Sequence, residues 1–250
     1  MSLDDNVVTL APYFVLKDAA KFKDIWRADY ADFKHKEDCV HYAFGFEGDT
    51  RAHCREAYTS AETVLQHLSD VDVPLKAVLD PSIAELQKLE VHGPASELEK
   101  LQEALSPLGA MFFACEWGFR AAKPAMEQDT VVHLYPYFSM KDEAAFRNIW
   151  QQAYPATQAA AAAEKSHQYA FSFDGSMASC RESYADADGV LLHLQNVDAP
   201  LKAALSESVA ALDHLEVHGP AAELEKLRPA LEPLGAEFFA IEWGFRNAVN

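Results

Sequence analysis

The chain has 250 residues, 50% of them hydrophobic, so it is long enough for one large or two small packed cores. Its formal net charge of −18 at pH 7 disfavours nucleic-acid phosphates and anionic membrane surfaces as partners. No apolar run approaches the ~20 residues that a membrane span needs, and no signal-like apolar core follows the first residues, so we expect a soluble cytoplasmic protein.

The chain contains two tandem repeats. Residues 53–120 align without a gap to 179–246, and most of the aligned positions are identical. Two copies are too few for a solenoid, so each copy should form a small domain that pairs with the other. We therefore predict one unit over 7–120, a linker over 121–130 and a second unit over 131–246.

The first repeat predicts strands and helices in the order β-α-β-β-α-β-α-β. Residues 7–16 favour a strand with Pro12 at an edge or a bulge, and Asp18 can cap the helix that follows. Bulky and small side chains alternate along 42–46, as in a strand, and a hairpin turn at 47–50 leads to the returning strand. The later elements are a helix opened by a capping box at 59–62, helical turns through 74–86, a short strand at 89–92, a helix opened by Gly93-Pro94 and a closing strand at 112–119.

This order of elements fits a ferredoxin-like βαββαβ core with one added helix and strand better than it fits a doubly wound parallel sheet. Helices that cover one face of such a sheet leave the other face open. In this chain the second repeat can cover that face. We therefore predict an α+β protein in which two tandem ferredoxin-like units form an intramolecular α/β barrel.

A short motif carries a resemblance to a known family. It is a strand that ends in Glu-x-aromatic, followed by a helix that ends in His. The motif occurs as Glu56, Tyr58 and His67 in the first repeat and as Glu182, Tyr184 and His193 in the second. In this the sequence resembles the antibiotic-biosynthesis-monooxygenase-like family of the dimeric α/β-barrel superfamily. The resemblance implies a cavity between the helices and the open face of the sheet.

The resemblance also implies an activity. The better understood members oxidise polycyclic phenols or quinols with O₂ and without flavin or metal, because the substrate itself supplies the electrons. Such a site must deprotonate or hydrogen-bond a phenol, hold it against aromatic walls and exclude water. His67 and His193 are the implied bases, since the pKa of histidine lies near neutral pH. The residues implied in substrate binding are Trp26, Glu56, Tyr58, Trp150, Glu182 and Tyr184. We thus expect a cofactor-independent monooxygenase that acts on a small aromatic or quinol-like compound and holds no metal.

The same side chains also have structural interpretations. A helical histidine beside core leucines is often packed or capping, and a tryptophan on a helix that covers a sheet is often core. Glu116 and Glu242, which stand among aromatic residues in the last strands, are expected to be buried and paired with Arg120 and Arg246; the alternative is a carboxylate with raised pKa that acts as a general base. His92 and its counterpart His218 are expected to form a hydrogen-bonded, partly solvated rim with the glutamates two residues before them.

Two other functions stay open. One is a non-catalytic small-molecule-binding or stress-response protein of the same fold. The other is haem binding, which the resemblance disfavours because Ala77 and Ala203 stand where haem-degrading members carry the iron-binding His. Cys54 and Cys180 are expected to be buried reduced thiols. Whether the internal pseudo-dimer forms a further homodimer is open at this point.

Overall fold

The computed structural model describes residues 7–33, 38–122, 125–126 and 128–248. The chain divides into two compact units. The first unit consists of Asn6–Ala114, Lys123–Asp129 and Phe239–Asn250, and the second of Met1–Asp5, Cys115–Ala122 and Thr130–Phe238. Each unit thus contains most of one repeat together with the end of the last strand of the other repeat. The linker over 121–130 stays a prediction, and its residues 123, 124 and 127 lie outside the described residues.

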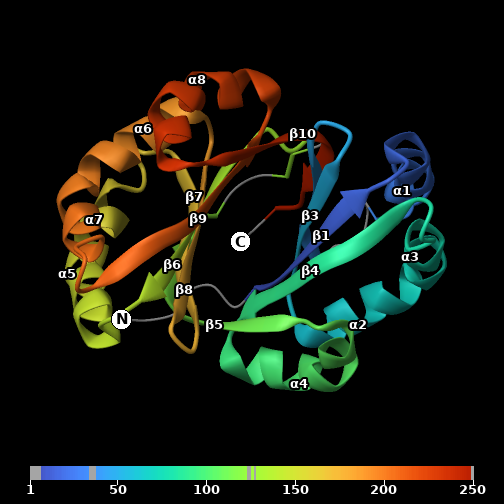
Figure 1. Ribbon diagram of the computed structural model, residues 1–250, viewed down its shortest axis with the longest axis horizontal. Coiled ribbons are helices and arrows are strands. Elements are labelled where there is room, and N and C mark those ends of the chain that lie inside the picture. The colour runs from blue at the N-terminus through green and yellow to red at the C-terminus, as the bar shows by residue number, and fades with distance from the viewer. Residues whose placement is uncertain (1–6, 34–37, 123–124, 127, 249–250) are drawn as a thin grey trace. The chain divides into compact units, whose positions relative to one another are not determined.

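The two repeats contain the same succession of elements (Figure 1). In the first repeat these are β1 Val8–Leu16, α1 Ala19–Phe33, β2 Cys39–Glu47, β3 Arg51–Tyr58, α2 Ala61–Asp70, α3 Asp72–Val78, β4 Ala84–Gly93, α4 Ala95–Leu105, the 3₁₀ turn η1 Ser106–Leu108 and β5 Met111–Arg120. In the second they are β6 Val132–Met140, α5 Glu143–Ala160, β7 Ser166–Asp174, β8 Met177–Tyr184, α6 Ala187–Asn196, α7 Asp198–Ala204, β9 Ala210–Gly219, α8 Ala221–Leu231, the 3₁₀ turn η2 Glu232–Leu234 and β10 Glu237–Arg246.

The strand order confirms the predicted fold class. In the first unit the antiparallel pairs give the ferredoxin-like order β4-β1-β3-β2, and in the second they give β9-β6-β8-β7. β10 adds to the first unit by pairing antiparallel with β2, from Ala240 opposite Phe46 to Arg246 opposite His41. The ten strands follow one closed hydrogen-bonded order, β1-β3-β2-β10-β9-β6-β8-β7-β5-β4, and so form a closed barrel.

The strand β4 is longer than the sequence predicts. Helical turns were expected through 74–86, but α3 ends at Val78 and β4 begins at Ala84. Residues 84–88 pair with β1, from Ala84 opposite Leu16 to Lys88 opposite Tyr13, and this ladder overrides their local preference for helix. β1 lies between β3 and β4 rather than at an edge, and its ladder with β4 is irregular at Tyr13, the residue after Pro12.

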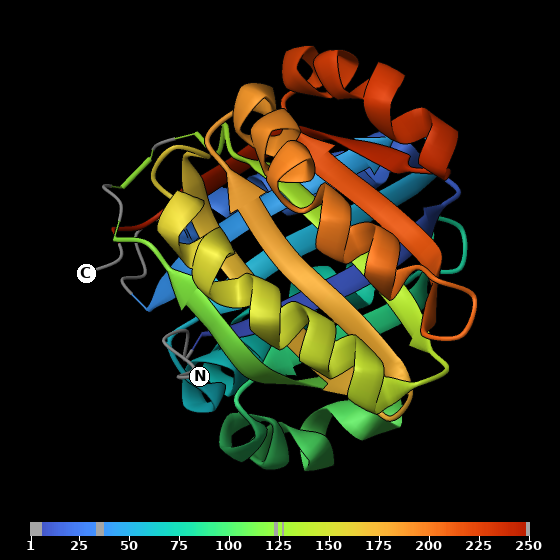
Figure 2. The same cartoon turned by 90° about the vertical axis from the view of Figure 1, so that its left-hand side faces the viewer.

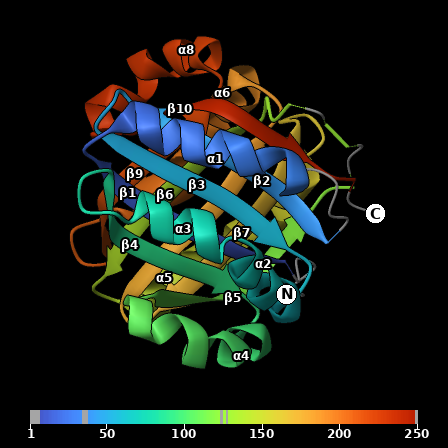
Figure 3. The ribbon, with the colours of Figure 1, turned by 90° about the vertical axis from the view of Figure 1, so that its right-hand side faces the viewer.

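The helices of each unit cover one face of its strands. Figure 3 shows α1, α2 and α3 across β1 to β4, and Figure 2 shows the matching helices α5, α6 and α7, in yellow and orange, across the strands of the second unit. Aromatic side chains fill the space between the layers. The ring of Trp26 on α1 lies 5.4 Å from that of Phe44 on β2, and Trp150 lies 5.1 Å from Phe171. None of the described helices is long and apolar enough to cross a membrane.

Candidate active site

Each unit has an apolar pocket between its helices and its sheet. The first pocket is lined mainly by leucines and aromatic residues, together with the polar side chains of Glu56 and His67. The second pocket has the same lining at equivalent positions, including Glu182 and His193. Each cavity measures about 50 Å³, which is room for a few water molecules. A ligand with an aromatic ring therefore needs the leucine side chains of the wall to move.

In the first pocket, β3 and α2 bring three polar side chains together. Alternation along β3 places Glu56 and Tyr58 on the face toward the helices. Ser60 caps α2, accepting a hydrogen bond from the backbone N–H of Thr63, and the buried face of that helix carries His67 in its last turn. His67 Nε2 lies 2.8 Å from Glu56 Oε2, and the Tyr58 hydroxyl donates to the same oxygen. All three side chains are buried.

The second pocket repeats this group, and there a fourth residue also lies within the described part of the chain. The Tyr184 hydroxyl donates to Glu182 Oε2 at 2.5 Å, and His193 Nε2 lies 3.1 Å from the same oxygen. The other ring nitrogen, Nδ1, lies 3.1 Å from Oε2 of Glu164, in the segment between α5 and β7. Asn196 Nδ2 donates to the second oxygen of Glu164 at 2.7 Å. The imidazole is thus held between two buried carboxylates.

Neither Glu164 nor Asn196 is marked by a motif in the sequence. Glu164 lies in the segment where the two repeats differ most, outside the strand and helix patterns on which the analysis depended. One signal was present, because Glu37 and Glu164 each stand five residues before the matching Tyr42 and Tyr169. Glu37 lies outside the described residues.

The charges around His193 determine its protonation. Burial opposes the charged ring, but the attraction of Glu182 and the hydrogen bonds with Glu164 and Glu182 prevail and raise the pKa of His193 from 6.5 to about 9. Burial would raise the pKa of Glu164, yet its hydrogen bonds with His193 and Asn196 keep that pKa below the ordinary value. At neutral pH the second pocket therefore holds an imidazolium between its two carboxylate partners.

The tyrosines that complete these groups stay neutral. Burial, followed by the negative charge of Glu56, raises the pKa of Tyr58 well above 10. The same two causes, with Glu182 as the charge, raise the pKa of Tyr184. Both hydroxyls are therefore hydrogen-bond donors to the carboxylates at any working pH.

The tryptophans predicted at the site lie in the pocket walls. Trp26 lines the first pocket and Trp150 the second, and each is 4% exposed. Among the described residues, neither indole Nε1 has a hydrogen-bond acceptor. A buried N–H donor without an acceptor is costly unless something else accepts from it. A ligand oxygen in each pocket could do so.

The pocket cysteines are not activated. Cys54 and Cys180 line the two pockets and are buried. Burial, followed by the charge of the adjacent glutamate, raises the pKa of each thiol well above 9. They are therefore neutral thiols near pH 7, poorly suited to act as nucleophiles.

Two expectations about other polar residues were wrong. Glu116 and Glu242 are partly exposed rather than buried, and they do not pair with the arginines of their own strands. Glu116 pairs with Arg147 of α5, while Glu242 contacts Lys23 and Arg27 of α1, the latter at 3.0 Å. Arg246 instead donates to Asp129 at 2.8 Å. The reason is geometric, because these carboxylates point to the covering helix of their unit.

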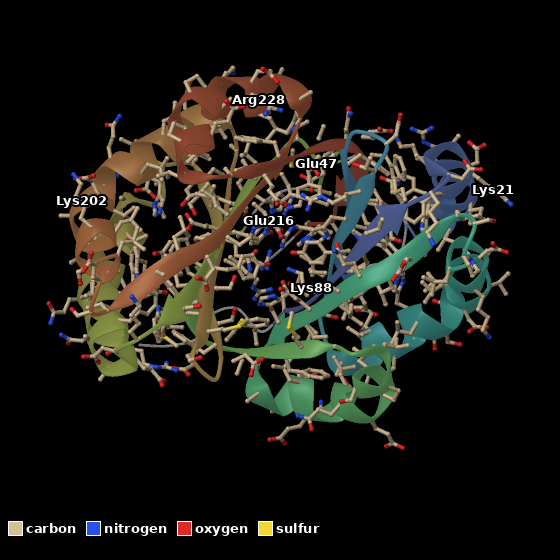
Figure 4. All side chains as sticks on the ribbon, viewed as in Figure 1. Lys21, Glu47, Lys88, Lys202, Glu216 and Arg228 are labelled. Atoms are coloured by element: carbon tan, nitrogen blue, oxygen red, sulfur yellow. The ribbon has the colours of Figure 1, made fainter. Side chains whose placement is uncertain are left out.

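The histidines at the ends of β4 and β9 form the expected pairs but are not solvated. His92 Nε2 lies 3.3 Å from Glu90, and His218 Nε2 lies 3.1 Å from Glu216, which Figure 4 labels. All four side chains are at most 2% exposed. By the alternation along their strands they face away from the leucines that line the pockets.

No protein-family model matches the chain, and no curated protein matches it in sequence. One similar solved structure is MupZ from Pseudomonas fluorescens, with 31% identity, covering 46% of this chain and 92% of that one, at a TM-score of 0.39.

Two solved structures of candidate monooxygenases match over most of their length. The protein from Lactobacillus acidophilus is 12% identical, with a TM-score of 0.54 and coverage of 85% of this chain and 92% of that one. The protein from Fusobacterium nucleatum is 16% identical, with a TM-score of 0.56 and coverage of 87% and 91%. This chain therefore shares the α/β-barrel fold of monooxygenase-like proteins.

Proposed function

We propose that the protein is a monooxygenase that oxidises a small aromatic or quinol-like compound with O₂ in its two pockets, without a bound cofactor. The observation that carries this proposal is the buried Glu–His pair on the wall of an otherwise apolar pocket, present in both units. Behind each pair a tyrosine outside the pocket lining, Tyr58 or Tyr184, donates to the glutamate. Buried ionisable groups in a cleft are typical of acid–base sites. The fold shared with candidate monooxygenases agrees with it.

The base in this proposal is the Glu–His pair rather than the histidine alone. In the second pocket His193 is already protonated at neutral pH, so Glu182 is the group that can take a proton from a phenol. The negative charge then moves from Glu182 to the substrate oxygen. The imidazolium of His193 lies beside both Glu182 and the proposed position of the substrate oxygen, so it stabilises the negative charge on either group. The Glu56–His67 pair has the same place in the first pocket.

The remaining steps need only substrate and O₂. A deprotonated phenol or quinol is electron-rich and can reduce O₂ directly. Where the oxidised carbon is a CH₂ group, one oxygen atom becomes the new carbonyl oxygen, and the other leaves as water with the two hydrogens. The apolar walls exclude bulk water, and the N–H groups of Trp26 and Trp150 are the donors for a substrate oxygen.

The test is oxygen uptake by the purified protein over a panel of hydroquinones and anthrone-like phenols, after dialysis against a chelator. We expect uptake with at least one compound and a fall of ~100-fold or more in the double variant His67→Gln/His193→Gln. Glutamine keeps a hydrogen-bond donor for the buried carboxylates, so the variant should stay folded. The matched control is His214→Gln, which removes a histidine of β9 that lines neither pocket.

Three results would contradict this proposal. Uptake that the double variant keeps would show that the two histidines, and therefore the Glu–His pairs as units, are not needed for the reaction. Uptake that chelation abolishes would show a metal requirement. No uptake by any compound, together with tryptophan quenching on binding, would leave the small-molecule-binding function in its place.

A further inference from the structure

We propose that Glu164 is a positioning residue of the second pocket, which keeps His193 oriented and charged while Glu182 exchanges a proton with the ligand. This inference rests on the proposed function for the role of Glu182. The position of Glu164 does not depend on it.

The two ring nitrogens of His193 have different partners. Nε2 faces Glu182, which lines the pocket, at 3.1 Å, and Nδ1 faces Glu164 at 3.1 Å from the opposite side of the ring. With both nitrogens engaged, the ring cannot rotate without losing two charge-assisted hydrogen bonds. Glu164 therefore fixes which nitrogen faces the pocket carboxylate. An aspartate has this role toward the histidine of serine-protease triads.

Glu164 itself is held firmly. Its side chain is 1% exposed, and its second oxygen accepts from Asn196 at 2.7 Å. Asn196 is the last residue of α6, one turn after His193, so the same helix carries both partners of the carboxylate. Its neighbour Val197 lies in the wall of the pocket, and both residues line an open groove of about 570 Å³ beside α5. Glu164 thus stands between the buried ring and a solvent-accessible surface.

The balance of charge explains why a second carboxylate matters. The groups around the ring are Glu182 and Tyr184 from β8, Tyr169 from β7 and Glu164 from the segment between α5 and β7. When Glu182 accepts a substrate proton it becomes neutral and no longer stabilises the imidazolium. Without Glu164, the buried ring would then tend to lose its own proton. With Glu164, one counter-charge remains and the cation stays beside the new substrate anion.

The decisive measurement is the NMR titration of His193 in Glu164→Gln, compared with the parent protein. We expect the pKa to fall from about 9 toward 6.5, and each unit of that fall is a tenfold change in the protonation equilibrium. The ring signals of His67 should not move, because Glu164 belongs to the other unit. In oxygen uptake the pH profile of Glu164→Gln should shift in the same direction.

Two further variants separate positioning from a general effect on stability. Glu223→Gln removes a carboxylate that accepts from the backbone N–H of Ala187 at the start of α6, so it perturbs the same helix without touching the ring. It should leave the His193 titration unchanged. Asn196→Ala removes only the support of Glu164 and should lower the pKa of His193 by a smaller amount than Glu164→Gln.

Three results would overturn the inference: an unchanged His193 titration in Glu164→Gln, an equal fall in Glu223→Gln, or, if Glu164→Gln does not fold, an unchanged titration in Asn196→Ala. None of these readings depends on oxygen uptake. If the protein takes up no oxygen but Glu164→Gln still lowers the pKa of His193, the proposed function is disproved. The assignment of Glu164 as the residue that orients the ring then still holds.

Discussion

The strongest quantitative prediction concerns the dependence of stability on pH. His193 has a native pKa of about 9 against 6.5 in the unfolded chain, and its side chain is 2% exposed. Because the native value is the higher one, the folded protein binds the proton more tightly. The resulting stabilisation is fully present below pH 6.5 and is lost as the pH rises through 9. A difference of that size corresponds to about 3 kcal/mol.

The assay is urea unfolding of the parent and of His193→Gln at pH 6 and at pH 9.5. The parent should lose about 3 kcal/mol between the two pH values relative to the variant, because the variant cannot take up this proton. The comparison of the two proteins cancels the titration of the groups that do not contact His193. His214→Gln, whose histidine is 31% exposed, should behave like the parent. Equal pH dependence in the parent and in His193→Gln would refute the double-carboxylate account of this ring.

Three further predictions follow from other parts of the molecule. In Gly244→Ala the new Cβ would lie 2.6 Å from Cβ of Ala43 and 2.9 Å from backbone atoms of β2. Urea unfolding should therefore show that the free energy of unfolding falls by ~1–3 kcal/mol. An unchanged midpoint would contradict this packing of β10 on β2. All four cysteines are buried, so a thiol reagent at pH 8 should label none of them in the native protein within minutes and all of them in urea; rapid native labelling of Cys54 or Cys180 would show that the pockets are open. Leu108 and Leu234 line the pockets but are 48% and 49% exposed, which places them at the mouths; the double substitution to Trp should weaken phenol binding several-fold in fluorescence titration without lowering thermal stability.

Local sequence patterns predicted most of the elements. The cap at Asp18 is where the sequence places it, accepting from Lys21 N at 3.0 Å. The cap of α2 is Ser60, one residue after the start of the capping box predicted over 59–62. The alternation along 42–46 marks a strand because its two faces meet different surroundings. The start of β4 was not predicted, since residues 84–88 contain good helix formers and become a strand only through their ladder with β1.

No local pattern in the sequence indicates that the last strand of each repeat, β5 or β10, is divided between the two units. Residues 112–119 read clearly as a strand, yet Met111 to Ala114 pair with β4 of their own repeat while the rest of β5 belongs to the other unit. The pairing of Glu116 with Arg147 follows from this exchange. No spacing within one repeat can reveal a partner that the other repeat supplies. The same holds for Glu242 and Arg27.

The candidate site was predictable only in part. The repeated motif named the glutamate, the tyrosine and the histidine of each pocket, and the structure brings Glu56 and His67 to 2.8 Å. The tautomer and the charge of His193 depend also on a second carboxylate, Glu164. Glu164 lies in a segment whose sequence has no helix or strand periodicity. Protonation is set by three-dimensional charge placement, so the role of a histidine cannot be inferred from its spacing alone.

The energetics of these groups argue that they serve a ligand rather than the fold. A buried ion pair is on average no more stabilising than well-packed apolar side chains of the same volume, because desolvation offsets the attraction. Each pocket nevertheless places a carboxylate and an imidazole among leucines and aromatic rings, where apolar residues would pack at no such cost. Among the described residues, the indole N–H groups of Trp26 and Trp150 have no acceptor, and the same holds for Trp117 and Trp243, which line neither pocket. The presence of these ionisable groups in both pockets is explained if they bind and orient the polar aromatic ligand proposed above.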